Sequence, residues 1–426
     1  MLPYASDHKP SRVPAITWAL LILTTLLSAW LILADRIAGP GRTAEMLAAV
    51  GLTPLRFHPL TLFTYIFFHA SIAHLIINLF YLYVFGAGVE EAVGRSWYVL
   101  LYLACGAVGG LLQWLVTVTL LSPMAAAVPI VGASAACAGL MGLFAVRYYR
   151  ARLAFVGLPF RPHVVSVVAL FLFMEIGLGL YALIAGSAAD GVAHWAHVGG
   201  FIFGLGCAHL LGLSAAGTRA YLSADATHAM DRSVPGAAIR KWELLLAREP
   251  DNPAVHEELA RAWLLLGDGD AGVQHYFQSM ILYLKGSDRD AAARIFSELH
   301  NIGLPRNDED KTARIATRTT LASLLMRLTP EQLFGIGSAL EANGRYDLAT
   351  EAFRIVSMRS PDSQEGETSI LKCASISLRK LGRIPEARAL IELFLDRYPN
   401  SPYRVLAEDL RREADAKPQP PQSPRV

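Results

Sequence analysis

A serine and a histidine in apolar segments of this chain are the first candidates for chemistry. Ser134 is the single hydroxyl in Val131–Gly142, a run of small apolar residues. His197 lies in Ala196–Gly204, where Gly200 and Gly204 follow on the same helix face. Glycines spaced four apart let two helix backbones come close. We therefore expect the imidazole to reach the hydroxyl, which would give a nucleophile with an adjacent base.

Packing alone is the alternative reading of both residues. Gly132, Ser134, Ala138 and Gly142 could form a small-residue face, with the hydroxyl bonded back to a carbonyl. A histidine inside a membrane could likewise be hydrogen-bonded only for packing. Ionisable residues are costly at that depth, however, and this cost favours a functional role for His197.

His74 and Asn78 are candidate oxyanion donors. They lie four residues apart and share one helix face, and neutral donors on one face can stabilise a developing negative charge. Ser134 is also near the start of its helix, where free backbone N–H groups favour an anion. The alternative is that His74 and Asn78 hold helices together through hydrogen bonds.

We expect no carboxylate in the layer that holds these groups, so the predicted arrangement is a Ser134–His197 dyad. Glu175 lies in the middle of another apolar segment. It could hydrogen-bond a neighbour structurally or line a substrate gate, and we leave it out of the catalytic set. The chain offers no metal or cofactor motif, because its four cysteines are scattered without a CxxC pair.

Apolar segments long enough to cross a membrane must position these groups. The chain is 53% hydrophobic and 17% charged, whereas soluble domains are about 25% charged. Charged residues are rare up to about residue 213. Apolar segments of about 20 residues predict transmembrane helices. The six predicted spans are Ala15–Ala34, His74–Val93, Trp97–Leu121, Gly132–Val146, His163–Ala185 and His194–Leu213.

Basic residues in the short loops predict the orientation of the bundle. They precede the first span and lie between the second and third spans, between the fourth and fifth, and after the sixth, whereas the loops around Met124 and Ala188 have none. Both termini are therefore expected in the cytoplasm. The basic residues are Lys9, Arg12, Arg95, Arg147, Arg150, Arg152, Arg161 and Arg219.

The C-terminal half predicts stacked helical hairpins. Leu333–Pro361 has small and aromatic residues at tetratricopeptide spacing, and a second unit follows 38 residues later. Stacked hairpins form a concave surface that usually binds protein. We predict a linker at 214–235, repeats at 236–412 and a disordered Pro-rich tail at 413–426. The net charge of +2 gives no reason to expect a nucleic-acid partner.

Three motifs together resemble a rhomboid intramembrane serine protease. They are His74-x-x-x-Asn78, Gly132-x-Ser134 and Ala196-His197-x-x-Gly200-x-x-x-Gly204, and the similarity covers about residues 15–213. The resemblance implies an all-α six-helix bundle in which Ser134 attacks a peptide bond and His197 acts as base and then acid. It also implies that His74, Asn78 and the Ser134 N–H bind the oxyanion, and that Glu90 is structural.

The sequence departs from the family pattern at two positions. Ala135 stands where the family usually has glycine, and Ala138 stands where it often has an aromatic residue that packs on the histidine. Trp195 or Phe201 could replace that ring. Neither departure removes a proton donor or acceptor, so activity is expected.

The leading functional prediction is an endopeptidase that cleaves transmembrane proteins near the outer face of a membrane, the bacterial inner membrane in this case. The predicted repeats would bind a protein partner or regulate access. The alternative is a catalytically inactive rhomboid-like scaffold that holds transmembrane clients. A transporter is disfavoured because the sequence shows no inverted repeat.

Overall fold

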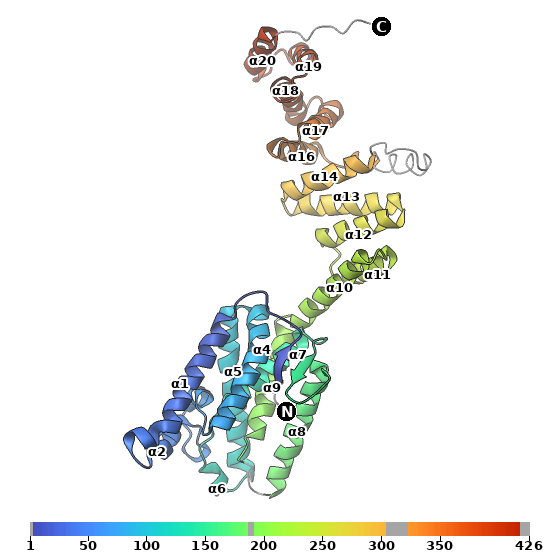
Figure 1. Cartoon of the computed structure of the whole chain (residues 1–426). Coiled ribbons are helices and arrows are strands. Elements are labelled where there is room, and N and C mark those ends of the chain that lie inside the picture. Colours follow the sequence, from blue (N-terminus) through green and yellow to red (C-terminus); the bar gives the residue numbers. More distant parts are fainter. Residues whose placement is uncertain (1–2, 186–190, 304–322, 418–426) are drawn as a thin grey trace. The chain divides into compact units, whose positions relative to one another are not determined.

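The structure, a computed structural model, describes residues 3–185, 191–303 and 323–417. The chain is mostly helical, as predicted, and divides into two compact units, residues 1–220 and 221–426 (Figure 1). The all-α prediction missed one small sheet. Strand β1 (Pro3–Ser6) pairs antiparallel with β2 (Leu153–Phe155), and these strands are too short for a clear alternating pattern.

Helices occupy all six segments predicted to be apolar spans. They are α1 (Ala15–Ala38), α4 (Ile72–Val93), α5 (Arg95–Leu120), α7 (Ser134–Arg147), α8 (Val164–Ala185) and α9 (His194–Leu210). Among the described residues, α1, α4, α5 and α8 are each long and apolar enough to cross a membrane. Helix α9 qualifies together with α10 (Leu213–Asp231), across a bend of 66°, and α7 is shorter. The count of six spans therefore remains a prediction.

Short elements connect the long helices on the side of the bundle where α7 begins. A bridge between Leu52 and Ile130 joins the two connecting segments there. The short elements are α2 (Arg42–Val50), η1 (Pro54–Arg56), α3 (Thr61–Thr64), η2 (Tyr65–Phe67) and α6 (Pro123–Ala126).

Helix α7 is the buried centre of the first unit, and every residue from Ala135 to Phe144 is buried. It runs parallel to α9 with the two backbones in contact. A Cβ at Gly200 would collide with the Ala135 carbonyl, and one at Gly204 would collide with the Gly139 carbonyl. The predicted glycine face thus allows an approach that no larger residue permits.

At the end of the bundle opposite the start of α7, two glutamates of α4 contact the N-terminal part of the chain. Glu90 of α4 accepts hydrogen bonds from the backbone N–H groups of Ile16 and Thr17, at 3.1 and 2.8 Å. These are first-turn donors of α1 that have no partner within their own helix. The next residue, Glu91, has its Oε2 atom 2.9 Å from His8 Nε2. Glu90 therefore caps α1 and ties it to α4.

Among the described residues from 235 onward, each helix packs on the next described helix along the chain. At the predicted repeat spacing, Gly337 lies against the Phe353 ring, which is completely buried. A Cβ at Gly337 would come within 2.8 Å of that ring. The helices are α11 (Pro235–Leu246), α12 (Pro253–Leu266), α13 (Gly269–Lys285), α14 (Arg289–Gly303), α16 (Pro330–Ala342), α17 (Tyr346–Arg359), α18 (Gln364–Arg379), α19 (Ile384–Arg397) and α20 (Arg404–Ala416).

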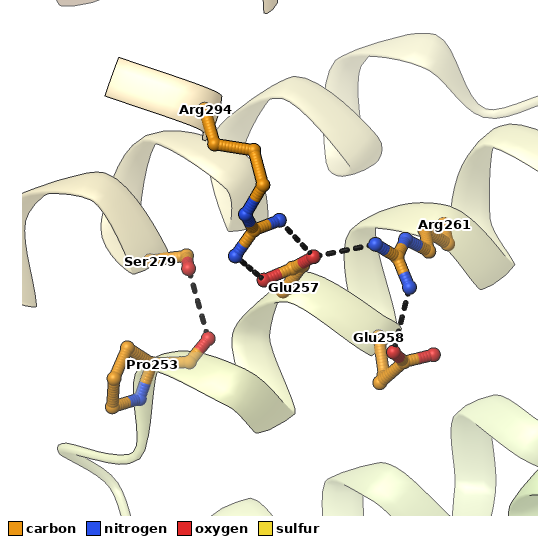
Figure 2. Close-up of polar contacts among 6 residues, drawn as sticks. All are labelled: Pro253, Glu257, Glu258, Arg261, Ser279 and Arg294. Atoms are coloured by element: carbon orange, nitrogen blue, oxygen red, sulfur yellow. Dashed lines mark hydrogen bonds and ion pairs between the residues drawn. The ribbon is translucent and has the colours of Figure 1, made fainter. Parts of the chain in front are cut away.

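Polar contacts join three of these helices, and a buried carboxylate links two of them (Figure 2). Glu257 of α12 accepts two hydrogen bonds from the Arg294 guanidinium of α14, at 2.6 and 2.8 Å, and another from Arg261. Ser279 of α13 donates to the Pro253 carbonyl of α12 at 2.9 Å. These polar contacts fix the register of α12, α13 and α14.

Two predicted boundaries need revision. The segment predicted as a linker at 214–235 is mostly helical, because α10 continues to Asp231. Its many alanines favour helix. At the other end, α20 extends to Ala416, so residues 413–416 do not belong to a disordered tail. The remainder of that predicted tail, from residue 418 on, lies outside the described residues.

Candidate active site

Ser134 and His197 meet in the first unit. Ser134 is the first residue of α7 and His197 lies in the first turn of α9. Ser134 Oγ and His197 Nε2 are 2.7 Å apart, which is a hydrogen-bonding distance. His197 is 9% exposed. The parallel contact of α7 and α9 places the two side chains at the same level.

The turn before Ser134 is held by hydrogen bonds. Gly132 has φ +134°, a backbone conformation that favours glycine, and its N–H donates to the Tyr65 carbonyl at 2.9 Å. The Ala133 N–H donates to His69 Nε2 at 3.2 Å, and His69 Nδ1 lies 3.0 Å from the Ser28 hydroxyl. His69 was not in the predicted site. It positions the segment that leads into Ser134.

The structure also brings His74 and Asn78 near Ser134, where all three line one cavity. A Cβ built at Gly132 would lie 2.9 Å from His74 Nε2 and 3.7 Å from Ser134 Oγ. Gly132 therefore makes room for the His74 ring beside Ser134. The Asn78 amide is buried and donates to the His74 carbonyl at 3.0 Å. An amide nitrogen carries two hydrogens, so Asn78 retains a second donor.

These side chains line a cavity of about 810 Å³. Its walls come from α4, α5, α7, α8, α9 and the segment that contains α6. Polar side chains lie among apolar ones, including Gln113 and Thr117 of α5. Gln113 Oε1 also accepts a hydrogen bond from the Ala196 N–H at 3.2 Å. The cavity can therefore hold both an apolar chain and a polar reacting group.

The prediction that no carboxylate lies in this layer is wrong. Glu175 Oε2 is 2.8 Å from His197 Nδ1 and 2.7 Å from His194 Nδ1. Counting residues placed Glu175 in the middle of its helix and His197 near an end. Helix α9 begins at His194, where the predicted span begins, but its first turn packs against Gly179 of α8, four residues from Glu175. The close approach at this glycine was not visible in the sequence.

By residue type, Glu175, His194 and His197 could also hold a metal ion, since their ligand atoms lie within 4.8 Å of one another. Two ligands on one tetrahedral zinc, at about 2.0 Å each, would be separated by about 3.3 Å. The observed N–O distances of 2.7 and 2.8 Å are shorter than this and fit hydrogen bonds.

The structure shows what surrounds Ala135 and which ring lies near the histidine in place of the one missing at Ala138. Ala135 is buried, and its carbonyl faces Gly200. An aromatic ring near the histidine comes from Phe171 of α8, whose centroid is 6.1 Å from that of His197. Of the two rings suggested to replace the one missing at Ala138, Trp195 packs against Gly179.

The contacts at His197, within a bundle of apolar helices, have the arrangement typical of the serine hydrolase class. A comparison with known families agrees with this class: residues 56–214 match the family model described as Rhomboid domain. This region contains every residue of the predicted site and supports the rhomboid family, whose members are generally intramembrane serine proteases. No curated protein matches the chain. The match and the apolar helices support an integral membrane protein.

Proposed function

We propose that this protein is an intramembrane serine endopeptidase that cleaves transmembrane protein substrates. The observation that carries the proposal is the 2.7 Å contact between Ser134 Oγ and His197 Nε2 at a cavity among apolar helices. A hydroxyl becomes a useful nucleophile when a neighbouring base takes its proton. The Rhomboid domain match over the same residues supports the same conclusion.

In this mechanism Ser134 Oγ attacks the carbonyl carbon of the scissile peptide bond, and His197 Nε2 takes the hydroxyl proton. The tetrahedral intermediate collapses, the C–N bond breaks, and His197 returns that proton to the leaving amine. Water then attacks the acyl-enzyme with His197 as base. Collapse releases the new carboxyl terminus and restores the Ser134 hydroxyl.

The oxyanion of both intermediates is held by donors around the start of α7. Backbone N–H groups in the first turn of a helix have no partner within that helix. The Ser134 N–H is one of these, and the His74 ring and the Asn78 amide line the same cavity. Donors fixed in advance toward a developing charge are often the largest contribution to catalysis.

The first unit also supports the proposed orientation. Strand β1 pairs with β2, which follows α7, so the N-terminal segment and the basic loop around Arg152 share one end of the bundle. Gly217 of α10 packs on the Arg147 carbonyl at that end. Ser134 begins α7 at the opposite end. We propose that the basic end is cytoplasmic and that the dyad faces the outer side of a bacterial inner membrane.

The helices of the second unit are proposed to form tetratricopeptide-like repeats that bind a protein partner or regulate access. The small residue at Gly337 against Phe353 supports repeat-type packing of α16 and α17. The rival proposal is an inactive scaffold that holds transmembrane clients in the same cavity. Both proposals use the same fold, and they differ in whether Ser134 is nucleophilic.

A fluorophosphonate probe tests this difference. The detergent-solubilised full-length protein should be labelled, with loss of fluoride and a covalent bond from Ser134 Oγ to phosphorus. Ser134→Ala and His197→Ala should abolish labelling while retaining the thermal unfolding transition of the wild type. A folded wild type that the probe never labels would favour the scaffold.

A further inference from the structure

We propose that Glu175 of α8 is a positioning residue for the dyad, so that the site works as Glu175–His197–Ser134 rather than as two residues. This inference rests on the proposed function. Its basis is one carboxylate oxygen, Glu175 Oε2, that contacts His197 Nδ1 at 2.8 Å while the other nitrogen of the ring contacts Ser134 Oγ at 2.7 Å. The three groups lie on α8, α9 and α7.

The contact with Glu175 selects the tautomer of His197. An ionised carboxylate only accepts hydrogen bonds, so His197 must carry its proton on Nδ1. In the neutral ring Nε2 is then unprotonated and can accept the Ser134 proton. This is the tautomer that a general base requires. Without an acceptor at Nδ1 the proton could occupy either nitrogen, and the tautomer with N–H at Nε2 cannot deprotonate Ser134.

His194 secures the carboxylate. Its Nδ1 lies 2.7 Å from the same Glu175 oxygen, and its side chain is 4% exposed. A carboxylate among apolar helices is costly unless donors satisfy it. The imidazole N–H groups of His194 and His197, which lie three residues apart on α9, supply that compensation. The pair therefore fixes both the charge and the direction of the Glu175 side chain.

A second effect arises during the reaction. When His197 takes the Ser134 proton it becomes an imidazolium, and this cation then lies 2.8 Å from the Glu175 carboxylate. The positive charge exists only after proton transfer, so the attraction stabilises the intermediate more than the resting state. A purely structural glutamate would stabilise the fold equally in both states.

The rate of fluorophosphonate inactivation distinguishes a glutamate that positions His197 from one that only stabilises the fold. In the full-length protein, Glu175→Gln keeps the side-chain shape but removes the charge, and it should lower the limiting inactivation rate at saturating probe by about 100-fold or more. The half-saturating probe concentration should change less than the limiting rate, because Glu175 acts through His197 on the proton transfer. Glu175→Leu, which removes the acceptor altogether, should react at least as slowly.

Glu90→Gln is the matched control. Glu90 is also a buried carboxylate that accepts two backbone N–H bonds, but it caps α1 at the other end of the bundle. This variant should lower the thermal unfolding temperature and leave the limiting inactivation rate unchanged. Equal loss of rate in folded Glu90→Gln and Glu175→Gln would overturn the inference, because the effect would then be one of general stability.

Histidine ¹⁵N NMR of the wild type provides a test that does not depend on activity. His197 should show a protonated Nδ1 and an unprotonated Nε2, and Glu175→Leu should increase the other tautomer. Wild-type reactivity in Glu175→Gln, or a stoichiometric metal ion at these histidines in the purified protein, would overturn the inference. A silent wild type with the expected tautomer would instead overturn the proposed function.

Discussion

Ser134 Oγ and His197 Nε2 lie 2.7 Å apart although 63 positions separate the two residues in the chain. This distance depends on the backbone contact between α7 and α9. The carbonyls of Ala135 and Gly139 occupy the space where side chains at positions 200 and 204 would lie. The contact proposed to carry the chemistry at one end of α7 therefore depends on glycines farther along α9.

Gly204→Ala tests this dependence. The added methyl group would collide with the backbone of Gly139, since an ideal Cβ lies 2.7 and 2.8 Å from its two carbon atoms. We expect a loss of stability of about 1–3 kcal/mol and slower fluorophosphonate labelling. Gly206→Ala, on the same helix with nothing within 4 Å of its Cβ, is the control. Similar behaviour of the two variants would contradict backbone contact.

Asn78→Ala removes a proposed oxyanion donor. Loss of one such donor should slow labelling by about 10²–10³-fold, with the dyad contact left in place. Ile76→Ala is a suitable control because Ile76 lies on the exposed side of the same helix. Thermal unfolding of both variants should be measured in parallel. Full labelling of a folded Asn78→Ala protein would remove Asn78 from the proposed oxyanion site.

Glu257→Gln tests the buried ion pair of the second unit. The Glu257 carboxylate contacts both Arg294 and Arg261, and it raises the pKa of Arg294 through hydrogen bonding. Both arginines are partly exposed, so we expect a loss of about 1–3 kcal/mol in local stability. Hydrogen exchange of α12 and α14 in the full-length protein measures it. Glu258→Gln, which removes a partner of Arg261 alone, should cost about 0–1 kcal/mol.

A histidine pair makes the same region sensitive to acid. His256 Nδ1 and His275 Nδ1 are 3.0 Å apart, and burial lowers the pKa of both rings. In the unfolded chain each histidine has a pKa of about 6.5, and in the folded protein the pKa is lower. The neutral pair therefore contributes its full stability above about pH 6.5, and this contribution is lost as the pH falls from there through the folded-state pKa. The protection factors of amides in α12 and α13, measured by hydrogen exchange, should therefore fall in acid more in the wild type than in His275→Phe. An equal fall in the two proteins would contradict this linkage.

Truncation tests whether the two units act independently. Helix α10 packs on α7 through Gly217 and Arg147, so a chain that ends at Ala220 retains this contact, whereas one that ends at Leu213 loses it. We expect the longer fragment to fold and to react with the fluorophosphonate at the rate of the full chain. A folded fragment without reactivity would mean that the second unit takes part in the proposed catalytic unit.

Patterns within single helices could be predicted from the sequence, and contacts that depend on relative depth could not. Glycines at 200 and 204 predicted a helix contact, and the contact exists. Glu175 was misjudged because the sequence does not show which part of α8 lies beside the start of α9: the first turn of α9 packs against Gly179, in the interior of α8. His69 was passed over because its partner, the Ala133 N–H, is a backbone group.

Helix α8 carries one of the two groups that contact the nitrogens of the His197 ring, yet it is largely exposed, with only four of its residues buried: Val164, Val168, Gly179 and Ala182. If Glu175 orients the base, then the surroundings of this outer helix become a determinant of reaction rate. Lipid composition or detergent would tune turnover without touching the nucleophile. Assays in different bilayers should then disagree in rate while agreeing on the scissile bond.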